Sequence, residues 1–147
     1  MTFQPDPQII QWRMHFTSPP EKVYQMLTTD EGRAKFWAES AIETEDGIQF
    51  IFPGDYRWLA KILAADPPHR FSLEYYGGSK TSFLLAEDGS GGTDLTLTDE
   101  GVPPADRWEV TAGWVSVLMA LKAAVDFSVD LRNHDPDRTW QQEFANN

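Results

Sequence analysis

The stretch that decides the fold runs from Ala105 to Leu131 and reads ADRWEVTAGWVSVLMALKAAVDFSVDL. It follows Pro103-Pro104, and its apolar residues recur with helical spacing, so we expect one helix roughly 40 Å long at about 1.5 Å per residue. One face of this helix carries Val110, Trp114, Val117, Leu118, Leu121, Val125 and Val129. A face this broad and apolar must be covered by another part of the chain.

The middle of the chain predicts a sheet that provides this cover. Apolar and polar residues alternate from Ile10 to Phe16, which is the period of two of a half-buried strand. The same alternation predicts strands at Ala41–Thr44, Ile48–Phe52, Arg57–Ala64, Phe71–Tyr76, Thr81–Ala86 and Asp94–Thr98. Short segments rich in Gly, Pro and Asp separate them, and connections this short join antiparallel neighbours. Such a meander covers a single long helix only if it curls around it.

Two short helices are expected after the first strand. Ser18 precedes Pro19-Pro20 and is followed three residues later by Glu21, a capping-box pattern that predicts a helix to about Leu27. A second short helix is expected from Gly32 to Trp37. The predicted fold class is therefore α+β: a helix-grip fold in which a curved antiparallel β-sheet wraps around a long C-terminal α-helix. Residues 1–147 are expected to form one domain, with a tail from about residue 134.

Composition excludes several classes of function. The formal net charge is -11 and the pI is about 4.5, so the surface should repel nucleic acid and anionic lipid. There is no cysteine, which removes thiolate catalysis and Cys-type metal sites and fits a reducing compartment. The N-terminal residues do not resemble a signal peptide, and no apolar run reaches the roughly 20 residues of a membrane helix. We expect a cytoplasmic protein without membrane insertion.

Both ends of the chain carry family-like motifs. The segment from Ser18 to Tyr24, followed by Leu27-Thr28-Thr29 and Phe36-Trp37, resembles the opening of the AHSA1 family, the Hsp90 ATPase activator homologues. Ala112-Gly113-Trp114, with the later Leu118, Leu121, Lys122 and Asp130-Leu131-Arg132, is similar to the long helix of that family. The family belongs to the START-like, Bet v 1-like (SRPBCC) superfamily, so the resemblance implies the helix-grip fold over nearly the whole chain. The middle differs, because Gly54-Asp55-Tyr56-Arg57-Trp58 stands where the best-defined members have a tryptophan-glycine run.

Catalytic and metal motifs are not recognisable in the sequence. The histidines His15, His69 and His134 have no metal-site spacing, and no nucleophile elbow or phosphate loop occurs. Asp126 and Asp130 share one helical face and could in principle do acid–base work. Lys122 stands one turn earlier, however, which favours a solvated charge ladder. No metal, cofactor or catalytic residue is therefore assigned.

Aromatic residues give the strongest hint of a ligand site. If the sheet curls around the helix, a group of apolar side chains should line the space between them: Trp37, Phe50, Phe52, Trp58, Phe71, Tyr75, Phe83, Trp114, Leu118 and Leu121. An ordinary packed core would explain the same residues, whereas a cavity would make them a pocket for a small hydrophobic molecule. Arg57 and Glu74 lie in predicted strands and are the candidate polar anchors of that pocket.

A second apolar face predicts a further contact. Ala120, Ala123, Phe127 and Leu131 lie roughly opposite Trp114, where a surface helix should be charged. We expect the tail from Arg138 to Phe144, with Trp140 and Phe144, to cover this face in the same chain or in a homodimer.

Three functions follow from these observations. The leading hypothesis is a binding protein for a small hydrophobic molecule. The alternative is a polyketide cyclase or aromatase, in which Arg57, Tyr75 or Glu74 polarises an enol or carbonyl. A third, implied only by the family resemblance, is an Hsp90 co-chaperone.

Overall fold

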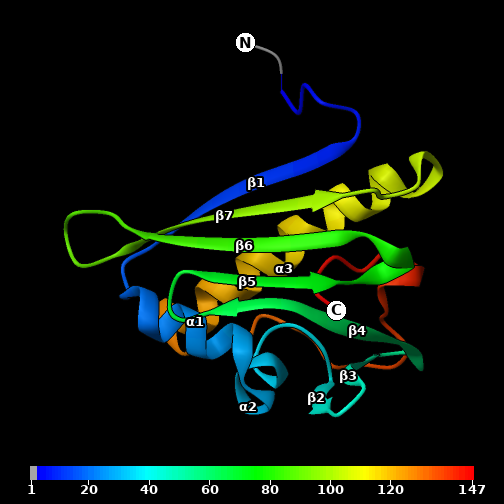
Figure 1. Cartoon of the computed structure of the whole chain (residues 1–147). Coiled ribbons are helices and arrows are strands. Elements are labelled where there is room, and N and C mark those ends of the chain that lie inside the picture. The colour runs from blue at the N-terminus through cyan, green and yellow to red at the C-terminus, as the bar shows by residue number, and fades with distance from the viewer. Residues whose placement is uncertain (1–2) are drawn as a thin grey trace.

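The structure is a computed structural model that describes residues 3–147, and its sheet is antiparallel throughout. The seven strands follow the order β1-β7-β6-β5-β4-β3-β2. They are β1 (Ile9–Phe16), β2 (Ser40–Thr44), β3 (Gly47–Phe52), β4 (Tyr56–Asp66), β5 (Arg70–Glu74), β6 (Lys80–Glu87) and β7 (Thr93–Glu100). The helices are α1 (Pro20–Thr28), α2 (Asp30–Ala34) and α3 (Arg107–Phe127). The predicted α+β helix-grip fold is confirmed, because α3 lies across one face of a curved sheet (Figure 1).

The connections explain how the sheet closes around the helix. Strands β2 to β7 form a meander of consecutive antiparallel neighbours, and β1 joins its far edge by pairing with β7. At the tight turn between β2 and β3, Gly47 has φ +133°, and a side-chain Cβ there would lie 2.2 Å from the carbonyl oxygen of Ala60. Only glycine fits a turn with that conformation and that approach.

The inner face of α3 fills the concave side of the sheet as expected. Trp114, Leu121 and Val125 are at most 3% exposed and belong to the main hydrophobic core. Each apolar side chain of this size contributes about 1.5–3 kcal/mol when it is fully buried. By length and composition the segment Pro104–Phe127 could cross a membrane, but these contacts make it the core helix of a soluble globular domain.

Helix α3 ends earlier than the sequence predicted. Ser128 adopts a left-handed conformation with φ 54°, and its backbone N–H donates to the carbonyl of Ala123. This C-cap stops the helix at Phe127 rather than at Leu131. As a result Val129, predicted on the buried face, is 48% exposed.

The expected capping box at Ser18 is also corrected. The residue at the N-cap of α1 is Pro19, and no side chain caps this end. Ser18 Oγ instead donates to Oδ1 of Asp126 at 2.8 Å, while the backbone N–H groups of Thr17 and Ser18 donate to the same carboxylate. The serine therefore links the start of α1 to the end of α3.

The second helix is shorter and begins earlier than the predicted Gly32–Trp37. Helix α2 starts at Asp30 because Thr29 caps it, its side chain accepting from the N–H of Gly32 at 3.0 Å. Arg33 is fully buried in this helix and donates to the carbonyl of Ala41. Trp37 thus lies beyond the helix, on the turn that leads into β2, and points into the core.

The tail takes a different course from the one predicted. Trp140 Nε1 donates to Glu109 at 3.0 Å, and Ser116 donates to the carbonyl of Ala145 at 2.7 Å. The tail therefore runs along the first half of α3. It leaves Phe127 67% exposed and Leu131 46% exposed, so it does not cover the face that includes them.

Candidate functional site

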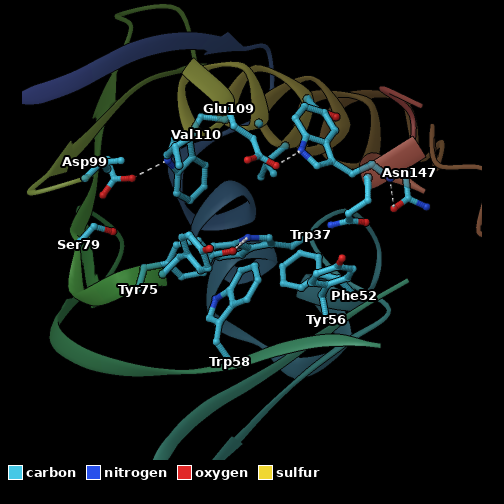
Figure 2. A pocket seen from close by; sticks show the side chains of 18 of the residues that line it. Trp37, Phe52, Tyr56, Trp58, Tyr75, Ser79, Asp99, Glu109, Val110 and Asn147 are labelled. Carbon is cyan, nitrogen blue, oxygen red and sulfur yellow. Dashed lines mark hydrogen bonds between the residues drawn. The ribbon is translucent and has the colours of Figure 1, made fainter. Parts of the chain in front are cut away.

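A cavity of about 400 Å³ lies between α3, the β3–β5 part of the sheet and the C-terminal tail (Figure 2). Aromatic residues form the largest group in its walls. The eight rings that line it are Trp37, Phe52, Tyr56, Trp58, Tyr75, Tyr76, Trp114 and Trp140. Such a volume and composition are typical of small-molecule sites, which are concave and mostly apolar at roughly 300–1,000 Å³.

The rings hold one another in place. Trp37 is central, with ring centroids 5.7 Å from Tyr75 and 6.1 Å from Trp114. Phe52 stacks on Trp58 at 4.5 Å, and Trp58 meets Tyr75 edge to face at 5.4 Å. These offset and edge-to-face contacts are the favourable arrangements for aromatic pairs. The walls are therefore ordered before any ligand arrives.

Asp99 is a buried carboxylate in the cavity wall. It is 1% exposed and stands at the end of β7, beside Ser79 in Figure 2. Trp114 Nε1 donates to its Oδ2 at 2.8 Å, and Thr81 Oγ1 donates to its Oδ1 at 2.9 Å. Burial raises the pKa of Asp99, and the bonds from Trp114 and Thr81 oppose this rise.

Tyr75 and Trp58 place two further polar groups at the cavity. Trp37 Nε1 donates to the hydroxyl of Tyr75 at 3.0 Å, and burial raises the pKa of this phenol far above its ordinary value. Tyr75 is thus a neutral hydroxyl at every physiological pH. Nε1 of Trp58 is buried and makes no hydrogen bond of good geometry among residues 3–147, although its N–H is near enough to the Tyr75 hydroxyl to oppose the rise in the pKa of that phenol. A buried N–H without an acceptor costs about 1–3 kcal/mol.

The tail forms the outer wall. Trp140 lies over Gly113, where an added Cβ would be 3.9 Å from the indole ring, and its N–H binds Glu109 at the cavity rim. The hydroxyl of Ser116 and the side chain of Asn147 also line this side. The segment after α3 therefore completes the cavity.

The structure divides the predicted cavity residues into two groups. Trp37, Phe52, Trp58, Tyr75 and Trp114 line the cavity. The remaining predicted residues do not line it and lie in the buried core: Phe50, Phe83, Leu118 and Leu121, with Phe71 packed on Tyr24. Phe50 and Phe83 contact Trp37 with centroid distances of 4.8 and 5.6 Å, so they support the cavity wall from behind.

The prediction that Arg57 and Glu74 are polar anchors of the cavity is wrong. Arg57 is exposed and pairs with Asp55, because its neighbour Trp58 takes the inward position on β4. Glu74 is exposed at the end of β5, next to the inward-pointing Tyr75. Successive side chains of a strand point to opposite faces, so a residue beside an inward aromatic points outward. Neither charge reaches the cavity.

Asp99 is the polar residue that sequence reasoning missed. The predicted strand stopped at Thr98, whereas β7 continues to Glu100. Extending the alternation of the buried Leu95 and Leu97 by two residues places Asp99 on the same inner face. The alternation of buried residues, continued two positions past Leu97, would therefore have identified Asp99 from the sequence.

The other acidic candidates lie outside the cavity. Asp126 accepts from Lys122 Nζ at 2.9 Å and from the start of α1, and its side chain is only 1% exposed. It is a buried structural carboxylate rather than part of a solvated ladder. Asp130 pairs with Arg132 at 3.0 Å and with His134 at 2.7 Å. Asp126 therefore fastens the end of α3 to α1, whereas Asp130 lies beyond the helix and organises the segment that follows it.

Comparison with known proteins agrees with the architecture. The SSP2350 protein of Staphylococcus saprophyticus is 23% identical with a TM-score of 0.72, over 84% of this chain and 96% of that one. The Aha1 dimer of Colwellia psychrerythraea is 25% identical with a TM-score of 0.67, over 81% of this chain and 96% of that one. CalU16 of Micromonospora echinospora is 25% identical with a TM-score of 0.64, over 78% of this chain and 72% of that one. Among curated proteins none matches the sequence significantly.

The family comparison covers most of the domain. The model for activator of Hsp90 ATPase homolog 1-like proteins matches residues 17–126, from the approach to α1 almost to the end of α3. It thus spans the helices, the meander and the core helix that together form the cavity. The chain therefore belongs to the AHSA1 family, within the START-like superfamily, as its end motifs predicted.

Proposed function

We propose that this protein binds a small hydrophobic molecule in the cavity between the sheet and α3. The observation that carries the proposal is a preformed space of about 400 Å³ whose lining is mostly apolar and includes eight aromatic rings. A space of this volume can hold a compound of two or three fused rings. In this proposal the protein acts in the cytoplasm and uses neither a metal nor a cofactor.

Gly113 offers a direct test, because it lines the cavity from α3 and the nearest atom to an added Cβ would belong to the Trp140 ring, 3.9 Å away. The substitution Gly113→Leu should fill part of the cavity, whereas Ala112→Leu places a leucine on the exposed side of the same turn. Binding is measured by titrating the neutral fluorescent probe N-phenyl-1-naphthylamine. The wild type and Ala112→Leu should bind it saturably, and Gly113→Leu should bind at least about tenfold more weakly, or about 1.4 kcal/mol.

Two outcomes would contradict the proposal. One is the lack of saturable binding by the wild type. The other is equal binding by the two leucine variants, which would place the probe outside the cavity. Circular dichroism of both variants provides the check that each is folded.

The proposal includes a homodimer formed through α3. A stripe of apolar residues on the outer side of this helix is exposed, with Trp108 at 90%, Met119 at 49% and Val115 at 40%. A similar protein, the Aha1 of Colwellia psychrerythraea, is a dimer in solution. Sedimentation velocity should give twice the chain mass of 16.7 kDa, and Met119→Glu should reduce it to the monomer. A monomeric wild type at every concentration would exclude this dimer.

A cyclase or aromatase is the second candidate function. The observation that favours it is that two ionisable groups, Asp99 and Tyr75, line the same cavity. The phenol could donate a hydrogen bond to a substrate carbonyl while the carboxyl exchanges a proton at an adjacent carbon. Turnover of a linear poly-β-ketone by the wild type, and its loss in both Tyr75→Phe and Asp99→Asn, would support this function. Unchanged turnover in both variants would remove it.

A further inference from the structure

The charged groups of the cavity are all of one sign. Asp99 stands in the inner wall and Glu109 at the rim, while no Lys, Arg or His belongs to the lining formed by the described residues. An apolar neutral ligand would require neither carboxylate. The sign of the charge therefore carries information about the ligand.

Asp99 has an unusual environment for a carboxylate. It is 1% exposed, the side chains of Trp114, Thr81 and Ser79 that stabilise it are all neutral, and it forms no ion pair within residues 3–147. Hydrogen bonds from neutral donors only partly replace the hydration that a buried anion loses. A positive charge placed in the cavity would compensate the part of the lost hydration that these hydrogen bonds do not replace.

The aromatic walls suit the same kind of ligand. The faces of indole and phenol rings attract cations, at about 0.5–1 kcal/mol where they are exposed and about 2 kcal/mol or more where water is excluded. Trp37, Trp58 and Trp114 are tryptophans, the ring type with the strongest attraction. Several such rings around one space are typical of sites for quaternary ammonium groups.

We propose that the ligand of this cavity is a hydrophobic cation, namely an amine or quaternary ammonium group carried on an apolar body. The positive charge is held among the indole rings on the Asp99 side, and Glu109 attracts it at the entrance. This inference rests on the proposed function, because it names the class of molecule that the same cavity binds.

The test compares two probes of nearly identical shape. Phenyltrimethylammonium and tert-butylbenzene differ in one atom, nitrogen for carbon, and in one positive charge. Each is used to displace N-phenyl-1-naphthylamine from the wild-type protein. The ammonium probe should bind at least about tenfold more tightly, which corresponds to about 1.4 kcal/mol.

The outcomes separate this inference from the function on which it rests. If the fluorescent probe and tert-butylbenzene bind but the ammonium compound has no advantage, the cationic ligand is excluded and the hydrophobic site remains. If none of the three compounds binds, the proposed function fails and the inference fails with it.

Single-charge variants locate the effect within the protein. Glu109→Gln keeps the hydrogen-bond acceptor for Trp140. It should weaken binding of the ammonium probe about two- to threefold, as expected for a partly exposed charge. Glu143→Gln removes the same charge from an exposed residue outside the cavity and should change nothing. Asp99→Asn should abolish most of the preference, provided that circular dichroism shows the variant to be folded. Equal losses in Glu109→Gln and Glu143→Gln would show that net charge, not the cavity, selects the cation, and would overturn the inference.

Discussion

Nε1 of Trp114 donates a hydrogen bond of 2.8 Å to Oδ2 of Asp99, so the core helix is attached to the last strand of the sheet by a bond at the cavity wall. Both residues are at most 3% exposed. The contact therefore serves two purposes: it fixes the indole ring as a wall of the cavity, and it partly compensates the buried carboxylate.

Removing this hydrogen bond should lower the free energy of unfolding. Trp114→Phe keeps an aromatic ring but leaves a buried oxygen of Asp99 without its donor, so we expect a loss of about 1–3 kcal/mol in the free energy of unfolding. Trp108→Phe is the matched control when both substitutions are made in the Met119→Glu background, where the proposed dimer is absent, because Trp108 lies on the same helix and is 90% exposed in the single chain. Its effect should be within about 0.5 kcal/mol. Urea denaturation measures both, and similar losses would show that the bond to Asp99 contributes little.

Tryptophan-to-phenylalanine substitution at Trp58 should not lower the free energy of unfolding, in contrast to the same substitution at Trp114. Nε1 of Trp58 is buried and makes no hydrogen bond of good geometry among the described residues, so Trp58→Phe removes a poorly satisfied donor and keeps an aromatic wall. We expect stability to be unchanged or to increase by up to about 1 kcal/mol, since the gain is offset by the smaller ring. A loss comparable with that of Trp114→Phe in the same denaturation assay would indicate that this N–H has a partner in solution.

Asp126 should stabilise the junction between α1 and α3 in a pH-dependent way. Burial alone would raise the pKa of Asp126, but the Lys122 ammonium and the donors of Thr17 and Ser18 outweigh it and hold the pKa well below its ordinary value. A depressed folded-state pKa gives stability that is present above the unfolded value of about 3.9 and is lost as pH falls through the folded value. Asp126→Asn should therefore cost about 1–3 kcal/mol at pH 7, and the difference from wild type should shrink as the pH falls below about 4.

An exposed ion pair provides the control for this change. Glu31 lies 3.6 Å from Lys35 with the same i,i+4 spacing, but its side chain is 86% exposed. Glu31→Gln should alter the free energy of unfolding by less than about 0.5 kcal/mol. A difference between wild type and Asp126→Asn that does not depend on pH would show that the charge of Asp126 is unimportant.

His134 should titrate above the ordinary range for histidine. The hydrogen bond with Asp130, followed by that with Glu39, raises its pKa despite partial burial; both contacts are 2.7 Å. A raised folded-state pKa means that the stabilisation is complete below the unfolded value of about 6.5 and is lost as pH rises through the folded value. NMR titration of the His134 ring should give a midpoint above about 6.5 that falls in Asp130→Asn. A midpoint unaffected by that substitution would contradict the assignment of the cause.

Asp99 should titrate above the ordinary range for a carboxyl group. Its pKa is raised chiefly by burial, so its protonated form is favoured by folding, and stability should decrease as pH rises from about 3.9 through the folded value. Carbon NMR of the Asp99 carboxyl should show a midpoint above about 3.9. Phenyltrimethylammonium should lower that midpoint if the cation lies near the carboxylate, whereas tert-butylbenzene should not. Identical midpoints with both compounds would place the cation elsewhere.

Periodicity determined which surfaces are buried. The helical spacing of Trp114, Leu118 and Leu121 required a covering layer, and the alternation along the strands provided it, because apolar groups must leave water whatever their final neighbours are. The fold class and the antiparallel meander followed from such patterns, whereas the family followed from its resemblance to the motifs at the two ends of the chain. Boundaries were less well determined: a left-handed Ser128 ends α3 at Phe127, and local φ and ψ angles of this kind leave no periodic signal.

The tertiary structure alone decided which of the predicted aromatic residues line the cavity and which polar groups join them. Register on β4 and β5 turned Arg57 and Glu74 outward and Trp58 inward, since the parity of a strand is set by its partners, and Tyr75, directly after β5, also lines the cavity. It also brought Asp99, Glu109 and Trp140 to one space, from segments that no local pattern connects. The sequence by itself determined that an apolar helix would be enclosed by a sheet. Only the three-dimensional packing decided that the enclosure keeps an aromatic space with acidic groups at its wall and rim, because the shape of a void depends on side chains far apart in the chain.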